Sequence, residues 1–363
     1  MRTPVTSTLH NTSGVELPGA RPQSPAGFRS HIREHGGVLI ALSAVAIFLC
    51  ITQPAFRTWS NVINIVGSNS VALMLALGAT FVIIAGGIDL SAAAVPATAG
   101  MVFGVTLRAG WPLFACIVAT TATGALVGLV NGLLIARAGI SFLVVTLGMT
   151  SVATSAALVI SNGTTVNVFS AEQFSAVHTF ATGSIGGISI ILLFDVAVIA
   201  SCAAVLGYTR FGRSVFAIGS NSEAARMNGI NVTLNTVYVY LLAGCAAGIA
   251  GVIQVGRLTG ASPQIDASLL NGVLAAVLIG GTAFSGGRGS ILGTALGVLF
   301  LGVVQNAMTL SDVSSFWRQG VNGVLLISAV WLGLRHSAGI SLRGVLDKYL
   351  TRLDSKKIGD TDE

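Results

Sequence analysis

Ten apolar stretches, most of them about as long as a membrane-crossing helix, follow one another along the chain. An α-helix of about 20 residues crosses a hydrocarbon core of about 30 Å. The stretches therefore predict an all-α polytopic membrane protein with about ten transmembrane helices. They cover roughly residues 37–53, 63–85, 91–107, 113–136, 141–161, 187–207, 236–256, 269–284, 289–307 and 317–334. Of these, 91–107, 269–284 and 289–307 are short, and tilted or broken helices are expected there.

The composition agrees with a chain that folds in lipid. Only 9% of the residues are charged, whereas soluble domains have about 25%. Residues 1–36 are rich in Ser, Thr, Pro and Arg and are expected to form a disordered cytoplasmic arm. Residues 37–334 are expected to form the membrane domain, and 335–363 a cytoplasmic tail that is first basic and then acidic.

The positions of the basic residues predict the orientation in the membrane. With a cytoplasmic N-terminus, only four of the 19 Lys and Arg residues fall in outer loops, and the other fifteen face the cytoplasm. The four are Arg57, Arg108, Arg257 and Arg318. Both termini are therefore predicted to be cytoplasmic. Since the basic residues flank the membrane or lie in the tail, they do not indicate a nucleic-acid surface.

The long internal loop 208–235 contains a predicted short helix. Asn221 or Ser222 can cap its first turn, Glu223 suits the positive end of the helix dipole, and Gly229 can end it. Such a helix could press on a soluble partner. It could equally be an ordinary surface helix between two spans.

Two glycine-rich segments interrupt the apolar stretches. In Gly86-Gly87-Ile88-Asp89-Leu90-Ser91, the glycines should break one helix and Asp89 or Ser91 should cap the next. A bend of this kind could also lie near a pathway or gate. The segment 280–289 predicts a tight turn with small-residue helix packing. It has no GxxxxGK[ST] pattern, so ATP hydrolysis by a P-loop in this chain is excluded.

No set of side chains predicts an enzyme or a metal site. The five histidines lie outside the apolar stretches, no HExxH occurs, and the four cysteines have no CxxC spacing. Asp195 is an acid inside an apolar run, and such a residue is a candidate proton site. The alternative is that Asp195 lies near the end of its helix or pairs with a polar neighbour.

The three motifs, in this order, carry a family resemblance. They are 86–91, the loop from Ala217-Ile218-Gly219 to Arg226, and Gly280-Gly281-Thr282 with Gly286-Gly287-Arg288-Gly289. Over about residues 37–334, the chain resembles permease subunits of bacterial ABC importers for monosaccharides of the ribose, xylose and arabinose type. The membrane domain is then a permease domain, and the loop 208–235 would hold a helix that couples it to an ATPase.

The resemblance implies partners and a location. Two cytoplasmic ATPase subunits would bind ATP and Mg²⁺, a periplasmic binding protein would deliver the solute, and a second permease, identical or different, would complete the path in the bacterial inner membrane. This chain itself would bind no cofactor and would not be an enzyme. Coupling to the ATPase is assigned to Gly219, Glu223, Ala224, Ala225, Arg226 and Gly229.

The solute pathway or gate is assigned to five polar residues in or beside the apolar stretches: Asn69, Asp89, Ser91, Asn131 and Thr146. Hydrogen bonding between helices explains Asn69, Asn131 and Thr146 equally well. Alternative functions are an importer of the same architecture for a polyol, nucleoside or branched-chain amino acid, an ion-coupled transporter using Asp195 or Asp89, and a membrane scaffold that transports nothing.

Overall fold

The computed structural model describes residues 28–264, 267–314 and 316–338. The chain divides into two units, residues 1–34 and 35–363. In the first unit, the described residues are the beginning of helix α1 (Phe28–Thr52). The remaining described residues belong to the second unit.

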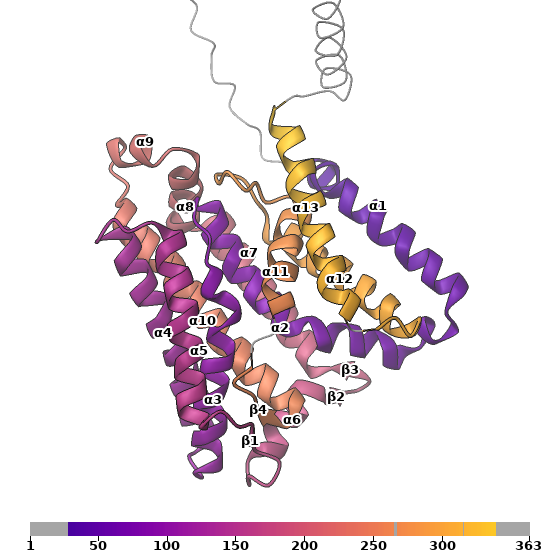
Figure 1. Cartoon of the computed structure of the whole chain (residues 1–363). Coiled ribbons are helices and arrows are strands. Elements are labelled where there is room, and N and C mark those ends of the chain that lie inside the picture. Colours follow the sequence, from indigo (N-terminus) through magenta and orange to yellow (C-terminus); the bar gives the residue numbers. More distant parts are fainter. Residues whose placement is uncertain (1–27, 265–266, 315, 339–363) are drawn as a thin grey trace, which may run out of the picture. The chain divides into compact units, whose positions relative to one another are not determined.

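Helices make up almost all of the described part of the second unit (Figure 1). The longer ones are α2 (Trp59–Ile84), α3 (Val95–Arg108), α4 (Leu113–Ala136), α5 (Phe142–Ser161), α7 (Ile190–Tyr208), α10 (Val232–Leu258), α11 (Ala267–Ile279), α12 (Ile291–Leu310) and α13 (Phe316–Ala338). The shorter ones are α6 (Phe174–Thr182), α8 (Arg210–Ser220), α9 (Ser222–Met227) and the 3-10 helices η1 (Pro54–Arg57) and η2 (Leu90–Ala93).

Within the described residues, four two-residue strands form two small antiparallel pairs in the connections. β1 (Val166–Asn167) pairs with β4 (Gly260–Ala261), with Val166 opposite Ala261. β2 (Ser184–Ile185) pairs with β3 (Ile188–Ser189) in a hairpin just before α7. The first pair ties the connection after α5 to the end of α10.

Each of the ten predicted apolar stretches contains a helix. Seven helical segments in the described part of the chain are long and apolar enough to cross a membrane: α2, η2 with α3, α4, α5, α7, α10 and α12. The stretch 91–107 is broken at Ala94, between η2 and α3, and α11 has only 13 residues. The prediction of a short helix was wrong for 289–307, because α12 has 20 residues. The chain is an all-α polytopic membrane protein.

Helix α1 extends into the sequence of the expected N-terminal arm. Helix α1 begins at Phe28, so residues 28–36 are helical. No proline follows Pro25 in this part of the sequence, and Arg, His and Glu are all compatible with a helix. At the other end, α13 continues to Ala338, beyond the predicted limit of 334. The rest of the expected arm and tail, 1–27 and 339–363, lies outside the described residues.

Helix α2 runs through the main core of the second unit. Its residues from Leu73 to Ile84 are all buried, against side chains of α7, α10, α11 and α12. By contrast, α4, α5 and α7 expose many large apolar side chains, such as Leu126, Leu147 and Val196. These exposed faces suit contact with lipid or with another membrane subunit.

Glycines allow α4 and α10 to pack with their backbones in contact. Gly124 and Gly128 of α4 face Gly244 and the backbone of Tyr240 in α10. A Cβ atom on Gly128 would lie 2.2 Å from the Tyr240 carbonyl oxygen, and one on Gly124 would lie 2.3 Å from that of Gly244. Small residues four apart on both helices are typical of close packing in membranes.

Candidate functional site

The three sequence motifs meet at one place, although they lie far apart in the chain. Gly219 is in the last turn of α8, Ile84 ends α2, and Gly287 lies in the loop between α11 and α12. The Gly287 amide donates a hydrogen bond to the Ile84 carbonyl oxygen at 2.9 Å. We call Gly86, Gly219, Gly286 and Gly287 the glycine junction. It joins α8 to the end of α2 and to the α11–α12 loop.

The contacts at the junction leave no room for side chains. A Cβ atom on Gly219 would lie 1.7 Å from the Ile84 carbonyl oxygen and 2.6 Å from the Gly287 nitrogen. One on Gly286 would lie 3.0 Å from both the Gly219 oxygen and the Gly86 Cα. Gly86, Gly286 and Gly287 also have positive φ angles of 85°, 82° and 71°. Both the close approach and the backbone conformation therefore require glycine.

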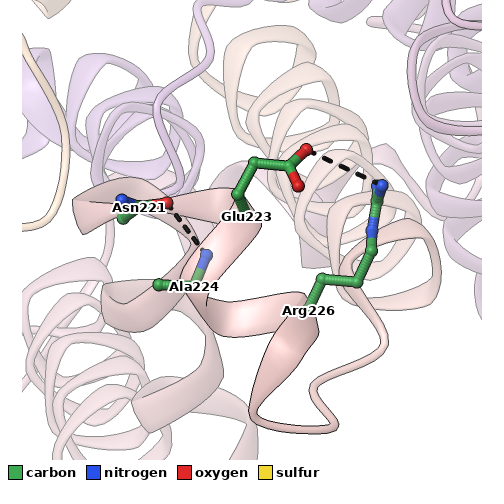
Figure 2. A network of polar contacts seen from close by, with 4 residues as sticks. All are labelled: Asn221, Glu223, Ala224 and Arg226. Carbon is green, nitrogen blue, oxygen red and sulfur yellow. Dashed lines mark hydrogen bonds and ion pairs between the residues drawn. The ribbon is translucent and has the colours of Figure 1, made fainter.

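Helix α9 follows directly and confirms the predicted short helix (Figure 2). The Asn221 side-chain oxygen accepts a hydrogen bond from the Ala224 amide at 2.9 Å and so caps the helix. Gly229, with φ of 78°, lies just beyond its end. Glu223 and Arg226 form an ion pair at 3.9 Å. Since their side chains are 81% and 64% exposed, this pair adds little stability and is free to contact a partner.

The exposed face of α9 is suited to docking. Ala225 is buried against the protein, whereas Glu223, Ala224 and Arg226 are exposed. Met227 is 88% exposed and extends this face, although the sequence analysis did not select it. Methionine is over-represented at adaptable binding surfaces because its side chain is flexible and apolar.

Sequence reasoning missed α8, the helix that links α9 to the rest of the protein. The Thr209 side chain caps α8 by accepting a hydrogen bond from the Gly212 amide at 3.1 Å. Val215 and Ile218 are buried on its inner face. Thr209 followed by apolar residues at helical spacing was a usable signal, but the glycines in this stretch obscured it.

Three of the five predicted pathway residues form one buried network. Asp89 caps η2 by accepting hydrogen bonds from the Ser91 amide at 2.9 Å and from the Ser91 hydroxyl at 2.5 Å. The Asn131 amide group then donates to the Ser91 hydroxyl at 3.0 Å. All three residues are buried, and the Asn131 side-chain oxygen has no partner. The network joins the break before α3 to the last third of α4.

The Asp89 carboxyl lies next to the junction segment, in surroundings that disfavour its charge. Burial raises the pKa of Asp89, and the hydrogen bonds from the Ser91 hydroxyl and amide lower it in part. The Tyr240 hydroxyl donates a hydrogen bond to the Ile88 carbonyl oxygen at 3.4 Å. A Cβ atom on Gly87 would lie 2.6 Å from the same hydroxyl. The turn is thus packed tightly against α10.

We expect Asp89 to act through its hydrogen bonds rather than through its charge. Asp89→Asn keeps an acceptor for the Ser91 amide, so its thermal unfolding in detergent should stay close to wild type. Asp89→Ala removes the cap and leaves buried groups unpaired, at a cost of about 1–3 kcal/mol. Its melting temperature should therefore fall clearly. Equal damage by both substitutions would show instead that the charge is needed.

The other two predicted pathway residues lie elsewhere. The Thr146 hydroxyl donates to the Phe142 carbonyl oxygen of its own helix, α5, at 2.8 Å. The Asn69 amide group donates to the Ile65 carbonyl oxygen of α2 at 2.7 Å, and Asn69 packs against Gly302 of α12. The structure therefore does not bring Asn69 or Thr146 into the Asp89 network.

Asp195 has a polar partner and lies near one end of its helix. It is in the second turn of α7 and is buried, and it accepts a hydrogen bond from the Ser70 hydroxyl at 2.5 Å. Arg257 is near enough for its charge to interact with the carboxylate. Although Arg257 was expected in an outer loop, it lies in the last turn of α10. Its guanidinium rests against Gly67, one turn of α2 before Ser70.

Comparison with known proteins gives the family. Residues 61–330 match the family model described as branched-chain amino acid transport system / permease component. The chain is 34% identical over 292 residues to the ribose import permease protein of Escherichia coli K12, covering 80% of this chain and 91% of the relative. No solved structure shows a significant match.

Two further relatives carry similar names. The D-allose transport system permease protein of E. coli K12 is 32% identical over 314 residues, which is 86% of this chain and 95% of the relative. The L-arabinose ABC transporter permease protein of Azospirillum brasilense is 34% identical over 294 residues, covering 81% and 86%. The family model spans the helices that form the junction, and each relative covers at least 80% of this chain, so the chain belongs to the permease-component family of transport proteins.

Proposed function

We propose that the chain is the permease subunit of an ATP-binding-cassette importer that carries a monosaccharide or a related small polar solute. The relatives named for ribose, allose and arabinose support a sugar as the solute. In this proposal the chain crosses the bacterial inner membrane ten times, and both termini are cytoplasmic. The permease domain is 37–334, and the loop 208–235 couples it to the ATPase.

The observation that carries the proposal is the glycine junction. Helix α9 offers an exposed face to a soluble partner, and α8 connects α9 to the junction. At the junction, α8 touches the end of α2 through backbone atoms, and α2 runs through the core. Backbone atoms in contact cannot move aside by a change of rotamer, as side chains can. A displacement of α9 would therefore be transmitted to α2 and to the α11–α12 loop.

The proposed mechanism is alternating access. Two cytoplasmic ATPase subunits bind and hydrolyse ATP with Mg²⁺, and this chain binds no cofactor. A periplasmic binding protein delivers the solute to a path between this chain and a second permease subunit. Closure of the ATPases moves α9, and the junction passes this movement to α2. The buried Asp89 network lies beside the end of α2 and would hold the turn before α3 while α2 moves.

Glu223→Lys tests the coupling assignment. The substitution reverses the charge on the exposed face of α9 and should cause the ATPase subunits to be lost. The tagged chain is purified from membranes in mild detergent, and its partners are identified by mass. Wild type should retain an ATPase with a Walker motif in near-equal amount, whereas Glu223→Lys should retain at least about tenfold less. Uptake of labelled ribose, allose and arabinose should fall with it.

Glu172→Lys is a matched control. Glu172 is also an exposed acid, but it lies before α6. This connection follows the fifth predicted span, 141–161, so it is external when the N-terminus is cytoplasmic. The Glu172→Lys substitution should leave the ATPase bound.

A chain recovered without any ATPase in several detergents would contradict the importer proposal and favour ion coupling through Asp195. In that case an uncoupler would stop uptake. Uptake of a polyol, nucleoside or branched-chain amino acid instead of a sugar would leave the importer proposal in place and would change only the class of solute.

A further inference from the structure

A groove lies between α8 and α10, apart from the junction and the Asp89 network. Its volume is about 390 Å³. Arg210, Phe211 and Ser214 of α8 form one wall, and Asn235, Tyr238, Leu241 and Leu242 of α10 form the other. None of the residues assigned to coupling or to the solute path lines this groove.

The groove changes from polar to apolar along α10. Arg210 comes directly after α7 and lies where α7 and α10 leave the predicted hydrocarbon region. Tyr238 lies two turns into α10, and Leu242 lies about one turn further, on a helix that is long and apolar enough to span the membrane. At a rise of about 1.5 Å per residue, the seven-residue step from Asn235 to Leu242 covers about 10 Å. A phospholipid in the inner leaflet has the same order from the cytoplasmic surface inward, with its charged headgroup at the surface and its acyl chains deeper.

Aromatic rings hold the groove in shape. The Phe211 ring stacks on Phe81 of α2, with 6.3 Å between the ring centroids. The Tyr238 ring meets Phe211 edge to face at 6.4 Å. Phe81 is buried in the main core, so the groove wall is anchored to α2. A wall of this kind exists before a ligand binds, which lowers the entropy cost of binding.

The charge of Arg210 favours an anionic ligand in the groove. Within the described part of the chain, the Arg210 guanidinium forms no ion pair with a carboxylate, and the ion pair found in this part joins Glu223 to Arg226. Arg210 and Tyr238 are both exposed at the groove. Arginine binds phosphate oxygens through two parallel hydrogen bonds, and tyrosine is enriched at the membrane surface. A ligand with a phosphate group and apolar chains complements both the polar and the apolar side chains that line the groove.

We propose that this groove is a binding site for an anionic phospholipid. Arg210 binds the headgroup phosphate, Ser214 and Tyr238 border the headgroup, and Leu241 and Leu242 contact the upper part of an acyl chain. The lipid would then fill the space between α8 and α10 and brace α8 against the membrane. This proposal requires only that the chain lies in a membrane, so it stands or falls independently of the proposed importer function.

Lipid binding can be measured directly on the full chain. The protein is purified in mild detergent with the subunits that it retains, and phosphatidylglycerol or phosphatidylethanolamine is added. Native mass spectrometry then counts the lipids that stay bound. Wild type should retain one phosphatidylglycerol in preference to phosphatidylethanolamine. Arg210→Gln should reduce the retained phosphatidylglycerol at least about fivefold.

Arg213→Gln is the matched control. Arg213 is an exposed arginine on the same helix, but it does not line the groove. Its substitution should leave the bound phosphatidylglycerol unchanged. Leu242→Asn should weaken retention without removing the charge. The proposal would be overturned by equal retention of the two lipids, by equal losses in Arg210→Gln and Arg213→Gln, or by a complex whose ATPase subunits displace the lipid.

Discussion

Replacing Gly219 by alanine should stop solute uptake while leaving the chain folded in the membrane. The new Cβ would lie 1.7 Å from the Ile84 carbonyl oxygen and 2.6 Å from the Gly287 nitrogen. Both are backbone atoms, so no change of side-chain rotamer relieves the overlap. Helix α8 must therefore move away from α2, and the hydrogen bond between Gly287 and Ile84 must adapt to a new position. We expect uptake of the imported sugar to fall to background.

The fold should survive because the junction lies at the end of α2 rather than in the middle of the core. A purified Gly219→Ala variant should insert normally and elute as wild type in detergent. Its ATPase partner should remain bound, since the exposed face of α9 is unchanged. Loss of transport with the ATPase still bound would show that the contact between α8 and α2 is disrupted, and that binding of the ATPase to α9 is not.

Gly207→Ala provides the control for this experiment. Gly207 lies in the last turns of α7, and a Cβ atom there would have no neighbour within 4 Å. Alanine also favours helix more than glycine does, by about 1 kcal/mol. Uptake by this variant should therefore equal wild type. Normal uptake by a stably expressed Gly219→Ala variant would refute the role of the junction.

Much of the fold could be predicted because the dominant signal is local. A continuous apolar stretch of about 20 residues favours a helix. In lipid only helices and closed β-barrels satisfy the backbone hydrogen bonds, and the strands of a barrel are about half as long. The same reasoning is weak outside the membrane. It placed the start of α1 nine residues too late and missed α8, because a polar or glycine-rich stretch can still form a helix when tertiary contacts stabilise it.

The convergence at the junction could not be predicted in the same way. Gly86, Gly219 and Gly286 are each a plausible turn or helix end by themselves, and nothing local shows that they touch. Their contact depends on how α2, α8 and the α11–α12 loop pack. The same holds for Ser91 and Asn131, which lie on different helical segments. Polar residues in apolar stretches indicated that partners exist, but not which partners. Asn69 and Thr146 show the limit of that signal, since each bonds within its own helix.

Replacing Gly128 by valine should prevent the protein from folding at all. A Cβ atom on Gly128 would lie 2.2 Å from the Tyr240 carbonyl oxygen, in the middle of the α4–α10 contact. Overpacking a core costs about 1–3 kcal/mol when side chains can adjust. Here two backbones must separate, so the cost should be larger. We expect the membrane-inserted yield to fall at least about tenfold and the remaining chain to aggregate in detergent.

Gly148→Val shows whether this loss reflects the contact rather than valine in a membrane helix. Gly148 lies in α5, where a Cβ atom would meet open space, so the yield should stay near wild type.

The comparison also separates two uses of glycine in this chain. Gly128 brings α4 against Tyr240, whose side chain reaches the turn before Asp89, so its loss removes the scaffold itself. Gly219 joins two parts of a scaffold that is already complete, so its loss removes only the transmission. If Gly128→Val folded normally, the α4–α10 contact would not be the rigid frame against which the junction works.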